Sequence, residues 1–407
     1  MFHSLQDIDS LLAVHTSYRD SCLNLIASEN YTSHLVRSYL DNDFGNRYGC
    51  YLTMSPEVRD YPGNRYINDF EVATHRLMQQ VFHGEYVDLR PIGGHMAGMA
   101  VVLALLEPED LVIEVSLRDW GHGLVGPMCQ VSHFNRTIQV RYMAFDENRC
   151  VDEALLEAQI RAERPRLVIF GGSGTLFAEP VRRFRKLADE MGFLIAYDAS
   201  HVTGLIAGGV FPNPLDEGAD IMFGSTHKSF PGPQGGFVIS NNRDLMQKVG
   251  ETLSPSLVTS HHLHRIPALA ASLLEMQNFG REYAAQIVKN SKALATSMAQ
   301  KGFNVLGASL GYSETHLILV DVGGLVESGP ARYLEAAGIL CNDDFSGESP
   351  QIRIGTSEIT RRGMKESDMD EIAELLKRLL MDHEPAEAVQ KAVAEMVSHF
   401  SGCLYSL

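Results

Sequence analysis

The clearest pattern along the chain is an alternation of short apolar runs with longer segments of helical spacing. The apolar runs are of strand length and lie at residues 111–115, 166–170, 193–197 and 220–223. The segments between them place apolar residues three and four positions apart, at residues 96–106, 153–163 and 181–191. Strands that alternate with helices in this way predict an α/β layer built on a mainly parallel sheet.

The pattern changes on both sides of this region. Residues 4–18 carry an amphipathic helical pattern, whereas residues 40–69 are irregular and rich in Asn, Asp, Gly and aromatic residues. Residues 266–300 indicate a long helix, after which strands and helices mix up to a last amphipathic helix at 387–400. We therefore expect an N-terminal helical arm over 1–30, a large α/β domain over 31–279 and a small α+β domain over 280–407.

Composition narrows the class of protein. A chain of 407 residues with 45% hydrophobic and 21% charged residues fits a globular protein of two or three domains. The net charge of -17 argues against nucleic acid or an anionic membrane as partner. No apolar run reaches membrane-spanning length, and the first residues do not resemble a signal peptide. Six scattered cysteines without a C-x-x-C pair predict reduced thiols in a cytoplasmic protein with no metal site.

The first candidate for chemistry is Lys228, in the stretch G-S-T-H-K-S-F-P-G-P-Q-G-G from 224 to 236. Short apolar strands are expected on both sides of this stretch, at 219–223 and 236–240. A partly desolvated amine on such a tight loop loses proton affinity and can attack carbonyl carbon, as a Schiff-base lysine must. The alternative is an ordinary solvated lysine in a hairpin.

Two other strand ends add matching groups. Asp198 ends an apolar run thirty residues before Lys228, where a buried carboxylate requires a cation such as a protonated ring nitrogen, unless it only caps the next turn. Gly93-Gly94-His95 opens a helix whose N-terminus could bind a phosphate, although such a pair is more often a simple turn. Together these groups indicate pyridoxal 5'-phosphate as cofactor. His122 is a candidate to stack on its ring, with an ordinary loop histidine as the alternative.

Several longer motifs resemble the serine hydroxymethyltransferase family. They are N-L-I-A-S-E-N-Y (24–31), L-L-E-P-E-D (105–110), D-A-S-H-V-T-G-L-I-A-G-G-V (198–210), the stretch 225–236 and R-I-G-T-S-E-I-T-R-R-G (353–363). The resemblance runs from about residue 20 to 380. It implies the fold-type I pyridoxal phosphate transferase fold, with a mainly parallel seven-stranded sheet between helices and a smaller α+β C-terminal domain. It also implies a homodimer with shared active sites and a small amino acid as substrate.

The resemblance assigns roles to single residues. It makes Lys228 the Schiff-base lysine, pairs Asp198 with the pyridine nitrogen and stacks His122 on the ring. The remaining cofactor contacts are His201 beneath the phenolic oxygen, Ser173 near the phosphate, Gly93, Gly94 and His95 at the phosphate, and Thr226 and His227 beside the lysine. The expected catalytic residues are Lys228, Asp198, His201, His122 and Thr226.

Substrate binding is expected to involve both chains of the dimer. Arg353 would hold the amino acid carboxylate through its planar guanidinium. Residues lining the substrate pocket would be Ser28, Tyr48 and Tyr61. Thr259 and His261 would contact the cofactor across the dimer. The three histidines at 261, 262 and 264 could also indicate a metal site, which is the less favoured interpretation.

The sequence departs from the family pattern where folate chemistry is concerned. The family reads E-G-Y-P-G-x-R-Y-Y-G-G where this chain has Arg59 in place of the glutamate and Ile67 in place of the second tyrosine. About ten residues, 49–58, are inserted just before it, and Glu57 or Asp60 could substitute for the glutamate. Gln234 replaces an arginine, and the loop at 342–350 is short. Tetrahydrofolate as a second cofactor is therefore left open.

These observations predict an enzyme that makes or breaks the Cα–Cβ bond of a β-hydroxy amino acid through a glycine quinonoid. It could act as a hydroxymethyltransferase, an aldolase or a transaldolase. One alternative is a pyridoxal phosphate racemase or aminotransferase that acts at Cα. Another is a non-catalytic paralogue, against which the presence of Lys228 and Asp198 argues.

Overall fold

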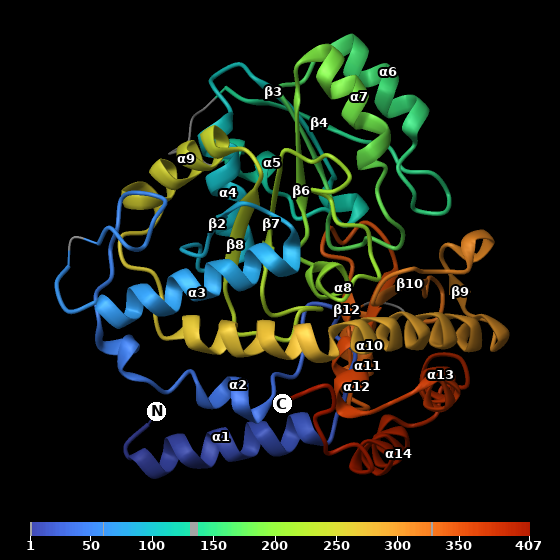
Figure 1. Cartoon of the computed structure of the whole chain (residues 1–407). Coiled ribbons are helices and arrows are strands. Elements are labelled where there is room, and N and C mark those ends of the chain that lie inside the picture. The colour runs from blue at the N-terminus through green and yellow to red at the C-terminus, as the bar shows by residue number, and fades with distance from the viewer. Residues whose placement is uncertain (1, 60, 131–136, 327–328) are drawn as a thin grey trace. The chain divides into compact units, whose positions relative to one another are not determined.

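The computed structural model describes residues 2–59, 61–130, 137–326 and 329–407 (Figure 1). The chain forms two compact units, one made of Met1–Tyr31 with Gln286–Leu404 and the other of Thr32–Ala285 with Tyr405–Leu407. The division between them falls inside a single helix, α10 (Arg265–Gln300). The expected three-part division with a separate N-terminal arm stays a prediction.

The larger unit is built on a seven-stranded sheet in the described part of the chain. Its strands, in spatial order, are β2 (Tyr86–Asp88), β8 (Gly236–Ser240), β7 (Ile221–Ser225), β6 (Leu194–Asp198), β5 (Leu167–Phe170), β3 (Leu111–Glu114) and β4 (Gln139–Tyr142). From β7 to β4 all neighbouring strands are parallel, and β8 runs antiparallel to both of its neighbours. The predicted mainly parallel seven-stranded sheet is confirmed.

The central strands are apolar on both faces because helices cover the sheet. Every residue of β5, β7 and β8 is buried, which explains why these strands read as continuous apolar runs. The edge strand β4 is mostly exposed and polar, and β2 has only three residues. Neither of these two carried a recognisable strand pattern in the sequence.

Helices of the larger unit pack on this sheet and on one another. They are α2 (His34–Ser38), α3 (Arg65–Phe82), α4 (Gly94–Leu105), α5 (Val125–Gln130), α6 (Glu153–Glu163), α7 (Val181–Met191), α8 (Thr203–Ala207) and α9 (Arg243–Glu251). α4 packs against β7, β8 and α9 through an apolar cluster. α6 and α7 lie side by side, joined by ion pairs from Arg183 to Glu153 and Glu157 (Figure 1).

One expected boundary is wrong. The sequence predicted irregular structure up to residue 69, but α3 already begins at Arg65. The N-cap residue, Asn64, makes no capping hydrogen bond with its side chain, which is turned instead to the carbonyl groups of Tyr48 and Tyr61. An asparagine side chain that would usually cap the helix therefore holds the preceding loop in place instead.

The smaller unit has the expected α+β character. Its four-stranded antiparallel sheet has the order β12 (Asn342–Asp343), β13 (Gln351–Gly355), β10 (Leu317–Asp321) and β9 (Asn304–Val305). β1 (Leu23–Asn24) pairs in parallel with β11 (Ile339–Leu340). The helices are α1 (Leu5–Asp20), α11 (Pro330–Glu335), α12 (Ser357–Arg362), α13 (Met369–Leu380) and α14 (Ala386–Ser398). Within the described ranges, no helix is both long and apolar enough to cross a membrane.

Candidate active site

Four neighbouring strands of the larger sheet end at one edge and carry polar residues there. β7, β6, β5 and β3 are adjacent and parallel, so their carboxyl ends meet at the same edge. The candidates on or just after these strand ends are Lys228, Asp198, Ser173 and His122. An amine, a carboxylate, a hydroxyl and an imidazole are thus collected on one edge by the topology.

Asp198, His122 and Lys228 form a connected group. Asp198 is 6% exposed, and its Oδ2 is hydrogen-bonded to Nδ1 of His122. Nζ of Lys228 lies 3.4 Å from Nε2 of His122. The buried ring of His201 lies 5.6 Å from the ring of His122, with 32° between their planes. The structure therefore brings together these four expected catalytic residues.

The electrostatics of this group favour an ionised carboxylate at Asp198. Burial raises the pKa of Asp198, but the charges of His122 and Lys228 outweigh it and lower the pKa to about 2. Burial, followed by the charge of Lys228, lowers the pKa of His227 to about 4. The pKa of His95 is lowered by burial and then by His122. Asp198 is consequently the charged acceptor of the site at neutral pH.

At Gly94 the N-terminus of α4 leaves no room for a side chain, because two hydroxyl groups lie beside it. A Cβ placed on Gly94 would lie 2.4 Å from Oγ of Ser225 and 2.7 Å from Oγ of Ser200, so only glycine fits. Gly93 is the N-cap residue, and the backbone N–H groups that follow begin a helix of 12 residues. Such an end, with hydroxyl groups beside it, suits an anion. His95 interacts electrostatically with His122, Asp198 and Lys228, which connects this end to the group above.

Two predicted cofactor contacts form backbone hydrogen bonds that shape the loops. The hydroxyl of Ser173 donates to the carbonyl of Trp120 at 2.8 Å. The hydroxyl of Thr226 donates to the carbonyl of Pro233 at 2.6 Å, and its backbone N–H donates to Gly235 at 3.0 Å. Thr226 thereby closes the loop that presents Lys228.

A second cluster in the larger unit contains the residues expected to act across a dimer. The hydroxyl of Tyr48 donates to Oγ1 of Thr259 at 3.0 Å, and the rings of Tyr48 and Tyr61 lie 4.7 Å apart. His261 is buried, and its Nε2 lies 2.8 Å from Oε1 of Glu71. We call these residues the Tyr48–His261 cluster.

Glu71 and Arg59 were missed as partners by the sequence argument. Both side chains are buried, at 0% and 1% exposure, and they form an ion pair. Glu71 also accepts from the hydroxyl of Tyr51 at 3.0 Å. Burial raises the pKa of Glu71, but His261 and Arg59 hold it well below its usual range. Of the two substitutes considered for the family glutamate, Glu57 lines a separate surface pocket with Val72 and Met246, and Asp60 lies outside the described residues.

The smaller unit carries Arg353 and Ser28. Arg353 lies on β13 and is 1% exposed; its Nη2 donates to Oδ1 of Asn342 at 3.0 Å, and its guanidinium lies 5.1 Å from the ring centre of Phe345. Burial lowers its pKa to about 9, so it keeps its charge at neutral pH. The segment before Ser28 packs on the same strand, since the backbone N–H of Gly355 donates to Leu25 at 2.7 Å.

The residues at the sheet edge fit a particular cofactor. A lysine, an ionised buried carboxylate one strand away and a helix end that admits only glycine match the aldehyde, the ring nitrogen and the phosphate of pyridoxal phosphate. Fold and site together define a pyridoxal-phosphate-dependent enzyme of fold type I.

Comparison with known proteins narrows this class. The family model described as serine hydroxymethyltransferase matches residues 3–376, and the chain belongs to this family. It is 39% identical over 417 residues to the serine hydroxymethyltransferase of Methanothermobacter thermautotrophicus, covering 98% of this chain and 95% of that protein. It is likewise 39% identical over 408 residues to the serine hydroxymethyltransferase of Thermococcus onnurineus, covering 97% and 94%.

A solved structure is similar along the whole chain. The L-threonine transaldolase of Pseudomonas fluorescens matches with a TM-score of 0.92 and 30% identity, over 99% of this chain and 93% of that one. The family and this neighbour agree with the predicted chemistry. The protein is a pyridoxal-phosphate-dependent enzyme that makes or breaks the Cα–Cβ bond of a small amino acid.

Proposed function

We propose that the enzyme cleaves and forms the Cα–Cβ bond of a β-hydroxy amino acid without depending on tetrahydrofolate, as an aldolase or a transaldolase. The observation that carries this proposal is the state of Arg59. The resemblance expects a glutamate at this position, as the group that moves protons on the hydroxymethyl carbon. Here a guanidinium is buried against Glu71. It cannot take up a proton, and it keeps Glu71 ionised and occupied.

The cofactor would be held by the group at the sheet edge. Lys228 would bind its aldehyde carbon, Asp198 would hold the proton on the ring nitrogen, and His122 would lie against the ring. The remaining contacts would be Gly93, Gly94 and His95 at the phosphate, with Ser173, His201, Thr226 and His227 around the ring and lysine. When bound, pyridoxal phosphate supplies an acceptor for the electron pair released at Cα. The low pKa of Asp198 supports its part, because a permanent anion is needed there.

Arg353 would bind the substrate carboxylate. A buried guanidinium that keeps its charge is suited to a carboxylate, which it can meet with two parallel N–H groups. Asn342 holds one nitrogen and the ring of Phe345 covers one face, so the direction of the remaining N–H groups is restricted. Ser28, Tyr48 and Tyr61 would line the substrate pocket.

A homodimer with shared active sites is part of the proposal. Thr259 and His261 would reach the cofactor of the second copy. Along α1 none of the side chains is buried, and Leu5 and Val14 are 80% and 64% exposed. Such an apolar surface favours coverage by a second copy of the chain. The six cysteines form no disulfide in the described part of the chain, which supports the cytoplasm as the location.

Folate-dependent hydroxymethyl transfer is the second candidate. It is favoured by the relatives that carry the name serine hydroxymethyltransferase at 39% identity. It would need a proton-transferring group other than the residue at position 59.

The test compares L-threonine and L-serine with and without tetrahydrofolate. We expect acetaldehyde from L-threonine at a rate that tetrahydrofolate leaves unchanged within about twofold. Glycine formation from L-serine that requires tetrahydrofolate and leaves the one-carbon unit on the folate, together with no acetaldehyde from L-threonine, would establish the second candidate instead. Loss of optical activity with no aldehyde and no folate-dependent glycine from either substrate would contradict both candidates. Lys228→Ala is the control that should abolish both activities.

A further inference from the structure

Glu179 is a half-buried carboxyl group that the proposed mechanism does not use. It precedes α7 by two residues and follows the loop that leaves β5. Its Oε1 accepts a hydrogen bond from Oγ1 of Thr175 at 2.9 Å, and its Oε2 accepts a short one from the hydroxyl of Tyr197. Thr175 lies in the loop of residues 171–175, and Tyr197 directly precedes Asp198. One carboxyl group therefore joins this loop to the end of β6.

The loop of residues 171–175 touches both sides of the site. Gly171 has a left-handed φ of 85°, and a Cβ on it would lie 2.2 Å from the carbonyl oxygen of Asp198. Ser173 donates to the carbonyl of Trp120 through both its backbone N–H, at 2.7 Å, and its hydroxyl, at 2.8 Å. His122 follows Trp120 by two residues. The loop is thus wedged between the backbone of Asp198 and the backbone that leads to His122.

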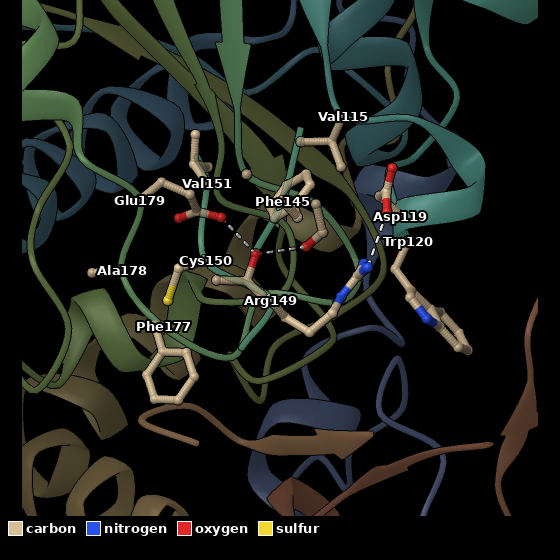
Figure 2. A pocket seen from close by; sticks show the side chains of 14 residues that line it. Val115, Asp119, Trp120, Phe145, Arg149, Cys150, Val151, Phe177, Ala178 and Glu179 are labelled. Carbon is tan, nitrogen blue, oxygen red and sulfur yellow. Dashed lines mark hydrogen bonds and ion pairs between the residues drawn. The ribbon is translucent and has the colours of Figure 1, made fainter. Parts of the chain in front are cut away.

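The surroundings leave Glu179 little room to move. It lines a cavity of about 20 Å³, enough for about one water molecule (Figure 2). On the other wall Arg149 is ion-paired with Asp119 at 2.9 Å and lies over the ring of Phe145 at 5.2 Å. The titratable and charged groups that face Glu179 are Tyr197 and Asp198 from β6, and Asp119, Arg149 and Cys150 from the cavity wall.

Charge considerations agree with a structural use of this carboxyl group. Burial raises the pKa of Glu179, the hydrogen bonds from Tyr197 and Thr175 act in the opposite direction, and the negative charge of Asp198 adds to the rise. A second anion beside Asp198 is therefore disfavoured. In such surroundings the two hydrogen bonds from Tyr197 and Thr175 offset part of the cost of placing a carboxyl group there.

We propose that Glu179 is a positioning residue that fixes the loop of residues 171–175 to the end of β6 and thereby sets the geometry of the His122–Asp198 pair. The proposal rests on the cofactor assignment given above and is independent of whether folate takes part. Glu179 touches neither substrate nor cofactor in this account. It acts through Tyr197 on one side and through Thr175 and Ser173 on the other.

The experiment measures cofactor binding rather than turnover. Cofactor-free protein is titrated with pyridoxal phosphate, and the dissociation constant and the pH midpoint of the visible absorption band are recorded for each variant. Glu179→Leu, which removes both hydrogen bonds, should weaken binding at least tenfold and shift the midpoint. Glu179→Gln, which keeps a group that can bond both hydroxyls but cannot ionise, should stay within threefold of the wild type.

A matched control separates positioning from general stability. Ser291 lies in the smaller unit, and its buried hydroxyl donates to the carbonyl of Thr315 at 2.6 Å. Ser291→Ala should lower the melting temperature and leave both cofactor readouts unchanged. If Glu179→Leu does not fold, Tyr197→Phe and Thr175→Val each remove one of the two bonds and should each weaken binding by threefold or more.

Three results would overturn the proposal. One is a Glu179→Leu variant that folds and binds the cofactor with unchanged affinity and unchanged pH midpoint. Another is a Glu179→Gln variant as poor as Glu179→Leu, since charge rather than hydrogen bonding would then be the requirement. The third is no effect in either Tyr197→Phe or Thr175→Val. A failure of the folate-independent activity would leave all of these affinities untouched, so the two proposals fail separately.

Discussion

Replacing Arg59 by methionine tests the most unusual feature of the larger unit, its buried ion pair with Glu71. Arg59 donates from Nε to the carbonyl of Gly49 at 2.8 Å and also bonds Asn68 and Glu71. The change removes the guanidinium and leaves a carboxylate that is 0% exposed. Glu71 keeps its contacts with His261 and Tyr51, so its charge is not left alone.

The expected loss follows from these contacts. Removing one member of a buried ion pair lowers the free energy of unfolding by about 3–5 kcal/mol. Because Glu71 keeps His261 and Tyr51 as partners, we expect a loss of about 3 kcal/mol for Arg59→Met. The exposed pair of Arg47 and Asp43, whose side chains are 53% and 62% exposed, is the matched control. Arg47→Met should leave the unfolding midpoint nearly unchanged, because an exposed ion pair contributes little to stability. Arg59→Lys keeps the charge but not the fork of donors, and should fall between the two.

The assay is urea unfolding of the cofactor-free protein at pH 7.5, followed by tryptophan fluorescence. The chain has one tryptophan, Trp120, which is 1% exposed and belongs to the larger unit, so the signal reports on the unit that contains the pair. A shift in the midpoint at constant slope measures the change in stability. If Arg59→Met and Arg47→Met unfold at the same urea concentration, the buried pair does not stabilise the fold as argued.

Three further predictions use the rest of the site and the smaller unit. Burial raises the pKa of Glu358 to about 7, against 4.5 in the unfolded chain. The protonated carboxyl group therefore stabilises the fold below about pH 4.5, and this contribution is lost as the pH rises through 7. Glu358→Gln should remove the corresponding slope from a plot of melting temperature against pH. Gly94→Ala should weaken pyridoxal phosphate binding at least tenfold in a direct titration, because its Cβ would meet the hydroxyl of Ser225, whereas Gly402→Ala, which meets no atom within 4 Å, should not. Arg353→Lys should raise KM for the amino acid about 10- to 100-fold while the cofactor affinity stays unchanged.

The parts of the fold that were predictable are those where one physical effect dominates. Strands buried on both faces must be apolar throughout, so β5, β6 and β7 are visible as runs, and their parallel order fixes which edge carries Asp198 and Lys228. Gly94 was visible for a related reason, because backbone that closely approaches a hydroxyl group excludes a side chain.

The parts that escaped prediction depend on contacts between distant side chains. Nothing in the residue types at 59 and 71 indicates that the two side chains are buried together, since arginine and glutamate are both common on protein surfaces. The same holds for Glu179 and Tyr197, which are eighteen positions apart and meet only because the loop after β5 folds back on β6. The edge strand β4 was not predicted because most of its residues are exposed, and an exposed strand lacks the apolar pattern on which strand prediction relies.

The pairing of β1 with β11 has a consequence for the order in which the protein can be made. Leu23 lies opposite Ile339, so β1 leaves the ribosome long before its partner strand and cannot pair until residue 339 has been synthesised. At about 5–20 residues per second the wait is on the order of 15–60 s. During this time the segment of β1 has no strand partner and stays accessible to a chaperone.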